Sequence, residues 1–124
     1  MITILEANSK QLLKDFVKFP FELYKNHPYW VPPLIADEME TFDKDKNPAF
    51  KSAEAYFYLA YKNDKVVGRI AAIINWNEVT EQQKSKVRFG GWETIDDVEV
   101  TKALLEKVYK KKKKNNLEHV EGPM

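Results

Sequence analysis

The side chains best suited to chemistry in this sequence are two histidines, a group of acids and a run of lysines. His27 and His119 are the only histidines, they lie far apart, and the sequence contains no cysteine. A structural zinc site usually combines cysteine and histidine ligands at short spacings. A hydrolase triad of the nucleophile-elbow type needs a serine within a glycine-rich turn. Neither pattern occurs, so the sequence predicts no metal site and no hydrolase of that kind.

Acidic residues gather before the middle of the chain, at Asp37, Glu38, Glu40, Asp43 and Asp45. They could recognise a basic acceptor, or they keep a helix and its exit solvated, and we favour the second interpretation. Five consecutive lysines, Lys110 to Lys114, suit the C-terminal end of a helix, where they complement the helix dipole. Nucleic-acid binding would want aromatic side chains nearby, and only Tyr109 is close. We therefore expect neither membrane nor nucleic-acid binding from these lysines.

Length and composition restrict the fold to one ordinary domain. The chain has 124 residues, of which 44% are hydrophobic and 13% aromatic, too apolar for a disordered segment. Its formal net charge of +1 excludes a strong overall attraction to polyanions. The first residues lack a basic stretch followed by an apolar one, and no run is long enough to span a bilayer. We expect a cytoplasmic protein.

Hydrophobic spacing predicts the elements of the first half. Residues 2–7 form a short β-branched strand, and Asn8 and Ser9 suit a helix start. Apolar residues then recur at helical spacing, which predicts a helix over 9–18, a break at Pro20 and a short turn over 20–25. A stiff loop with Trp30 follows, and a second helix begins near Pro33.

The second half carries the clearest signal, a hairpin. Residues 55–61 and 66–74 are rich in strand-forming side chains and flank a turn over 62–65. A strand is predicted over 86–95 and an amphipathic helix over 98–113, capped by Asp96. Another strand begins near Leu117. The element order is β-α-α-β-β-β-α-β, which predicts a mixed, mostly antiparallel α/β sheet covered by helices.

This order and several local motifs resemble the GNAT N-acetyltransferase superfamily, in particular its diverged bacterial members. The matching stretches are Phe19-Pro20-Phe21, Trp30-Val31-Pro32-Pro33-Leu34, Val67-Gly68-Arg69-Ile70, Phe89-Gly90-Gly91-Trp92-Glu93 and Glu121-Gly122-Pro123-Met124. The resemblance implies the acyl-CoA N-acyltransferase fold through its fifth strand. Since that fold normally continues with a further helix and two strands, we expect residues 1–124 to be one GNAT-like domain, truncated after strand 5.

The resemblance also implies a reaction, acetyl transfer from acetyl-CoA to an amine acceptor that the sequence does not identify. The family holds the cofactor's pyrophosphate on a glycine-rich turn before a helix, and the positions that correspond here are Thr94, Ile95, Asp96, Asp97 and Val98. These contain two carboxylates and no glycine. The general base of some members sits on the fourth strand, which assigns that role to Glu93, with Trp92 and Ile95 as apolar neighbours.

Two interpretations of the function stay open. In the first, the chain is an acetyltransferase in which Tyr56, Tyr58 or Tyr61 could supply a phenol as general acid. In the second, it is a non-catalytic binding or assembly module that keeps the fold. The open edge of the fifth strand favours pairing with another chain. We therefore expect a homodimer or a contact with a missing C-terminal half. The three tryptophans, Trp30, Trp76 and Trp92, could line a groove or anchor the core.

Overall fold

The computed structural model describes residues 2–43, 45, 47–80, 83 and 85–122. Along the chain it contains β1 (Ile2–Glu6), α1 (Lys10–Leu23), α2 (Ile35–Thr41), the 3-10 helix η1 (Pro48–Lys51), β2 (Ala53–Lys62), β3 (Lys65–Asn75), α3 (Trp76–Thr80), β4 (Lys86–Thr94), α4 (Val98–Lys114) and β5 (His119–Glu121). The predicted element order is confirmed, with the short helices η1 and α3 added to it.

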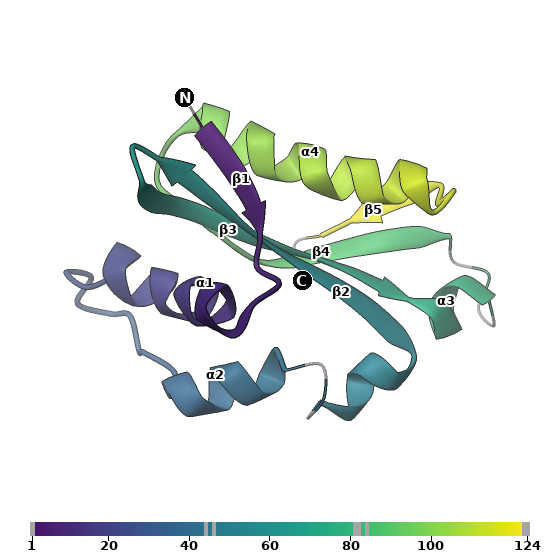
Figure 1. Cartoon of the computed structure of the whole chain (residues 1–124), viewed down its shortest axis with the longest axis horizontal. Coiled ribbons are helices and arrows are strands. Elements are labelled where there is room, and N and C mark those ends of the chain that lie inside the picture. The colour runs from purple at the N-terminus through teal and green to yellow at the C-terminus, as the bar shows by residue number, and fades with distance from the viewer. Residues whose placement is uncertain (1, 44, 46, 81–82, 84, 123–124) are drawn as a thin grey trace.

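The five strands form one sheet in the order β1-β2-β3-β4-β5 (Figure 1). Neighbours pair antiparallel except β4 and β5, which run parallel. The hairpin between β2 and β3 turns at Asn63 and Asp64, whose φ angles of 53° and 64° match a two-residue type I′ turn. The mixed, mostly antiparallel α/β fold class is therefore confirmed.

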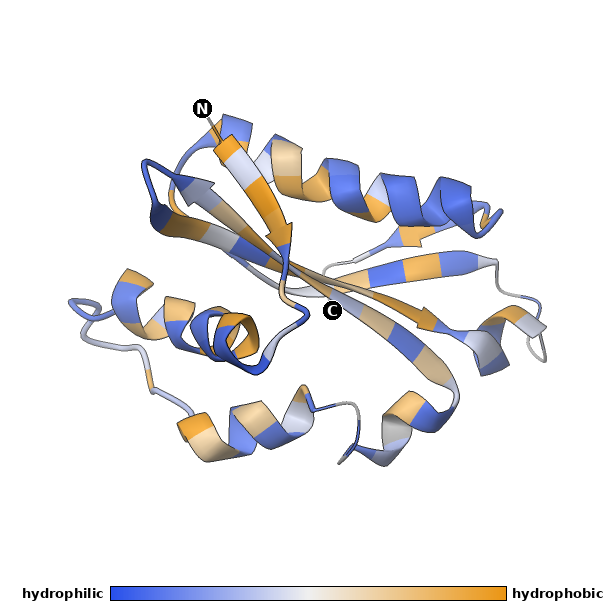
Figure 2. Cartoon of the chain, in the orientation of Figure 1, coloured by the Kyte–Doolittle hydropathy of each residue, from blue (hydrophilic) through white to orange (hydrophobic). Residues whose placement is uncertain are grey.

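Helices cover both faces of the sheet. Figure 1 shows α4 on one face and α1 with α2 on the other. On the first face, Val100, Leu104 and Val108 of α4 are fully buried against residues of β2, β3 and β4. On the second face, Phe16 of α1 packs against Phe57 of β2. In Figure 2 the C-terminal half of α4 is coloured mostly hydrophilic. No helix among the described residues is long and apolar enough to cross a membrane.

The predicted break at Pro20 is wrong, because α1 runs without interruption from Lys10 to Leu23. Pro20 has no amide hydrogen, so the Phe16 carbonyl lacks the helical donor four residues ahead. The guanidinium of Arg69, on β3, donates to that carbonyl at 2.6 Å instead. A side chain from the sheet thus replaces the hydrogen bond that proline removes. The other end of α1 is capped as predicted, by Ser9, whose hydroxyl accepts from the Leu12 amide.

The helix α4 begins at Val98 as predicted, but its cap residue differs by one position, and the start of α2 differs by two. The carboxylate that caps α4 belongs to Asp97 and not to Asp96, because the Asp97 side chain accepts from the Glu99 amide at 2.9 Å. The helix α2 begins at Ile35 rather than at Pro33. The first shift matters for the site, because it determines which carboxylate occupies the amides at the start of α4.

Candidate active site

A bulge in β4 determines which way its last residues face. Arg69 pairs with Glu93 and Ala71 pairs with Gly90, so β4 spans three residues where β3 spans two. The bulged Gly91 has a φ of +55°, a conformation that glycine adopts without strain. Phe89, before the bulge, packs on the face of α4, and strict alternation would place Glu93 there too. The extra residue instead turns Glu93 toward α1.

On that face Glu93 meets a phenol from the end of α1. The Tyr24 hydroxyl donates a short hydrogen bond to Glu93 Oε2. Tyr24 is the C-cap residue of α1, and its ring lies 5.5 Å from that of Trp30. The hydrogen bond to the carboxylate, followed by partial burial, raises the pKa of Tyr24. The phenol therefore stays protonated and remains a donor to Glu93.

A buried cation lies beside this pair. Arg69 is the cross-strand neighbour of Glu93 and is only 8% exposed. Its guanidinium carbon lies 4.6 Å from the centre of the Phe16 ring. Burial lowers the pKa of Arg69, while the charges of Glu93 and of Glu38, on α2, act in the opposite direction. The Nε atom of Arg69 is buried without a hydrogen-bond partner in the described part of the chain. The site thus combines a carboxylate, a phenol and a buried positive charge.

The edge of β4 that faces β5 is open over its second half. The parallel pairing of β4 with β5 joins Lys86 to His119 and ends where Arg88 meets Glu121. From Phe89 to Thr94, β4 has no strand on that side among the described residues. Arg88 holds the last paired position, since it forms ion pairs with both Glu121 and Glu78. An extended ligand could lie along the open half of β4 with its polar groups against the backbone.

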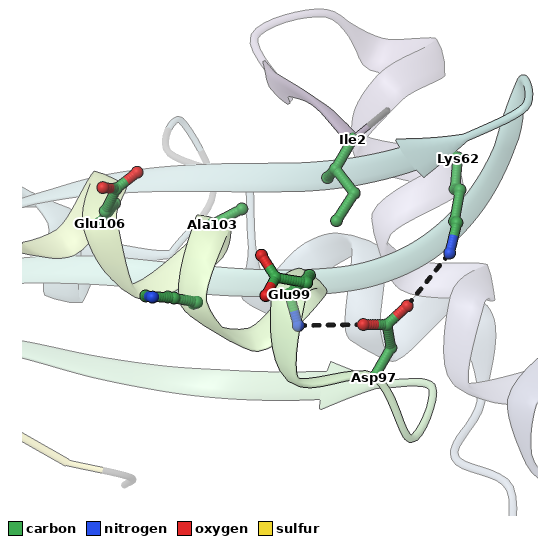
Figure 3. Close-up of a pocket in the computed structure, with 7 residues that line it drawn as sticks. Ile2, Lys62, Asp97, Glu99, Ala103 and Glu106 are labelled. Carbon is green, nitrogen blue, oxygen red and sulfur yellow. Dashed lines mark hydrogen bonds and ion pairs between the residues drawn. The ribbon is translucent and has the colours of Figure 1, made fainter.

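At the start of α4, Figure 3 shows the Asp97 side chain joined by hydrogen bonds or ion pairs to Glu99 and Lys62. The Asp97 carboxylate accepts from the Glu99 amide and forms an ion pair with Lys62 at 3.3 Å. These contacts, the amide first, lower the pKa of Asp97 and keep it ionised. A helix N-terminus binds phosphate through free amides, so a carboxylate that already accepts from one of them and adds its negative charge does not fit a pyrophosphate. The open edge of β4 fits the extended part of acetyl-CoA, whereas the start of α4 does not fit its pyrophosphate.

The remaining positions assigned to the cofactor differ in their exposure and in their backbone hydrogen bonds. Thr94 ends β4 opposite Gly68, and the Ile95 amide donates to the Val67 carbonyl at 3.0 Å. Asp96 and Val98 are exposed beside the capping Asp97. The five positions therefore lie together around the start of α4, but hydrogen bonds within the protein already use part of their backbone.

The structure separates several other candidates from Glu93. The apolar neighbours expected for it, Trp92 and Ile95, pack on the opposite face of the sheet, against the core that α4 covers. Tyr58 is buried in that same core. Burial raises the pKa values of Tyr56, Tyr58 and Tyr61. His27 lies exposed in the loop after α1 and His119 lies exposed in β5. Within the described ranges, no group of three or more possible ligands could hold a metal ion.

Sequence reasoning missed Tyr24 and Arg69. The sequence pattern gave Tyr24 no role beyond the short turn over 20–25, and it gave Arg69 none beyond the motif Val67-Gly68-Arg69-Ile70 of the resemblance. Tyr24 lies 69 positions before Glu93, and Arg69 lies 53 positions after its carbonyl partner, Phe16. Only one signal could have pointed to Arg69. A proline inside an otherwise continuous helical pattern leaves a carbonyl that needs a donor from elsewhere.

No protein-family model matches the chain. Among curated proteins it is 35% identical over 96 residues to protein YghO of Escherichia coli, covering 77% of this chain and 24% of YghO. It is also 30% identical over 74 residues to the bacterial ceramide synthase of Caulobacter vibrioides, covering 60% of this chain and 19% of that protein. The chain thus spans about a quarter or less of the length of these two relatives.

Solved structures with the same fold include acetyltransferases. A tandem GNAT protein from the clavulanic acid biosynthesis pathway matches with a TM-score of 0.67 at 12% identity, over 97% of this chain and 35% of that one. A predicted acetyltransferase from Clostridium acetobutylicum, solved with acetyl-CoA, matches with a TM-score of 0.63 at 13% identity, over 97% and 79%. An aminoglycoside acetyltransferase from a soil metagenome, solved with sisomicin, gives 0.62 at 12% identity, over 99% and 77%. The resemblance read from the sequence is thus confirmed in the structure, and the chain is a GNAT-like domain with the fold of these acetyltransferases.

Proposed function

We propose that the chain provides the acceptor side of an N-acyltransferase, with Glu93 as the base that takes a proton from an amine. The hydrogen bond between Tyr24 and Glu93, beside the open half of β4, is the observation that carries this proposal. It brings a carboxylate next to the edge where an extended acyl donor would lie. The GNAT-like fold supports acetyl-CoA as one such donor.

The reaction proposed is the transfer of an acyl group from a thioester to an amine. The amine nitrogen attacks the thioester carbonyl, a carbon–nitrogen bond forms, and the carbon–sulfur bond breaks. The proton that the nitrogen loses goes to the Glu93 carboxylate, and the thiolate leaves and is protonated by solvent. Tyr24 holds the carboxylate in place through its hydrogen bond, and the buried Arg69 lies beside it as its cross-strand neighbour.

A substrate with an apolar chain fits the surroundings of this pair. Trp30 packs on Tyr24, and the loop around it leaves large apolar side chains in solvent, with Tyr29 89%, Val31 83% and Leu34 70% exposed. The name of one relative, bacterial ceramide synthase, points the same way. A ceramide is the amide of a fatty acid and a long-chain amino alcohol. We therefore propose a long-chain amine as acceptor or a long-chain acyl group as donor.

Release of thiol from acyl-CoA tests the proposal. The 124-residue chain is assayed with acetyl-CoA or a long-chain acyl-CoA, and with a polyamine or a long-chain amine. We expect Glu93→Gln to lower the rate by about 100-fold or more, because it removes the base, and Tyr24→Phe to lower it less. Glu22→Gln, at an exposed glutamate of the same helix α1, is the matched control and leaves the rate unchanged. Transfer that survives in Glu93→Gln refutes the role of Glu93.

One observation favours the alternative of a non-catalytic assembly module, namely the Asp97 carboxylate at the start of α4. It removes the anion site that acetyl-CoA would use there. If the wild-type chain transfers no acyl group with any donor and acceptor, and calorimetry detects no binding of acetyl-CoA, the alternative replaces the enzymatic proposal.

A further inference from the structure

The free edge of the sheet at β1 lies between grooves on both faces. β1 is the first strand of the sheet and pairs only with β2, so one side of its backbone has no strand partner among the described residues. Two grooves are lined by residues of both β1 and α4, one beside Ile2 and one beside Ile4 and Glu6. A third hollow on the opposite face includes Thr3 and Leu5, and Leu5 is 44% exposed. An unpaired strand with apolar residues exposed beside it is a typical site for adding another strand.

The two grooves along α4 carry opposite charge. The groove beside Ile2, drawn in Figure 3, is lined by three acids, Asp97, Glu99 and Glu106, and by two lysines, Lys62 and Lys102. The groove beside Ile4 and Glu6 is lined by four lysines, Lys107, Lys110, Lys111 and Lys114, with Glu6 as its one acid. The first half of the surface is therefore slightly negative and the second half strongly positive.

The lysines of the positive half lack neutralising partners. Lys107, Lys110 and Lys114 form no ion pair with any described residue, and Lys111 lies 3.7 Å from the centre of the Tyr56 ring. Their spacing along α4 places them on one side of the helix. Four lysines held along one groove repel one another until an anion or a negative surface reaches them.

We propose that this surface binds a second copy of the same chain, with the two β1 strands paired antiparallel about a two-fold axis. Antiparallel pairing requires an axis perpendicular to the sheet, so both copies of α4 lie on the same face and run in opposite directions. With the axis near Ile4, residue 2 of one copy faces residue 6 of the other. The acidic half of each surface is then opposite the lysine half of its partner.

This charge order is what favours a second copy over another occupant. A surface that is negative at one end and positive at the other is complementary to itself after a two-fold rotation. An anionic lipid surface or a nucleic acid would neutralise the lysines but would be repelled by Glu99 and Glu106. The open backbone of β1 also matches the same strand of a second copy, since each side supplies the donors and acceptors that the other lacks.

Sedimentation of charge variants tests the dimer. The wild-type chain is expected to sediment with twice the mass of one chain as its concentration rises. An acidic variant, Lys107→Glu with Lys110→Glu, and a basic variant, Glu99→Lys with Glu106→Lys, should each weaken self-association by about tenfold or more. An equal mixture of the two variants should restore the dimer as a heterodimer, because each lysine half then meets an acidic half.

Lys112→Glu with Lys113→Glu is the matched control for the acidic variant. It changes the charge by the same amount on the same helix, but neither lysine lines a groove beside β1. The control is expected to associate like the wild type, and circular dichroism confirms that every variant is folded. A wild-type chain that stays monomeric at all concentrations overturns the proposal. So does a control that dissociates like the acidic variant, or a mixture that does not restore the dimer.

Discussion

The hydrogen bond between Arg69 and the Phe16 carbonyl explains why α1 continues through Pro20, and a double-mutant cycle can measure this. The two changes are Arg69→Met, which removes the donor from the sheet, and Pro20→Ala, which restores the amide of the helix. If the Arg69 guanidinium replaces that amide, the free energy of unfolding lost in Arg69→Met should depend on residue 20. The loss should be smaller when residue 20 has an amide hydrogen to donate to the Phe16 carbonyl.

The structure indicates the size of the effect. In the chain with Pro20, Arg69→Met leaves a carbonyl of a buried residue without a donor, which costs about 1–3 kcal/mol. Removing a buried cation also relieves a desolvation cost, so the single variant alone does not isolate the bond. In the Pro20→Ala background the restored amide can donate to the Phe16 carbonyl. The desolvation cost that is relieved by removing the Arg69 cation is the same in both backgrounds. Arg69→Met should therefore cost about 1–3 kcal/mol less in the Pro20→Ala background than in the wild-type background.

Urea unfolding followed by tryptophan fluorescence gives the four free energies of unfolding. The m-values should agree, which shows that the same surface is exposed in each variant. Arg88→Met combined with Pro20→Ala is the control cycle, because Arg88 forms its ion pairs with Glu78 and Glu121 and shares no partner with Pro20. The control should be additive within about 0.5 kcal/mol. If the effects of Arg69→Met and Pro20→Ala on the free energy of unfolding are also additive, Arg69 does not replace the missing amide of residue 20.

Two further predictions concern the contacts of α4. Gly68→Ala should lower the free energy of unfolding by about 1–3 kcal/mol, because its Cβ would lie 2.8 Å from Val100 Cγ1 and 2.9 Å from Leu104 Cδ1. Urea unfolding measures this change. A stability within about 0.5 kcal/mol of wild type would show that α4 is not packed so closely on β3. Asp97→Ser keeps a capping oxygen but removes the charge, so calorimetry should detect tighter binding of acetyl-CoA if Asp97 repels its phosphates, whereas Asp96→Ser, beside it but not capping, should change nothing.

Most of the fold could be predicted because its signals are local. Asn63 and Asp64 between two strand-like runs predict the hairpin, and the apolar spacing of α4 predicts its buried face. The continuous helix through Pro20 could not be predicted from local rules. The donor that compensates for the proline is on a strand 49 positions later, and periodicity within one element carries no information about it.

The candidate site was harder to predict than the fold, and the bulge in β4 is the main reason. Alternation along an unbroken strand would place Glu93 with Phe89 on the side of α4. One extra residue at Gly91 reverses the side. A glycine inside a strand is compatible with a bulge but does not show where the count changes, so Tyr24 could not be identified as the partner.

The sheet separates the two proposals, and this makes them independent. Glu93 faces α1, whereas the charged grooves of the β1 edge lie beside α4, on the other face and at the far end of the strand order. Variants of the lysine groove should then change the mass of the particle without changing acyl transfer, and Glu93→Gln should do the opposite. Asp97 bears on both proposals, since it caps the start of α4 and lines the acidic half of the β1 surface. A carboxylate that holds an amide at the start of its own helix disfavours phosphate there, and the same carboxylate can contribute to a self-complementary surface.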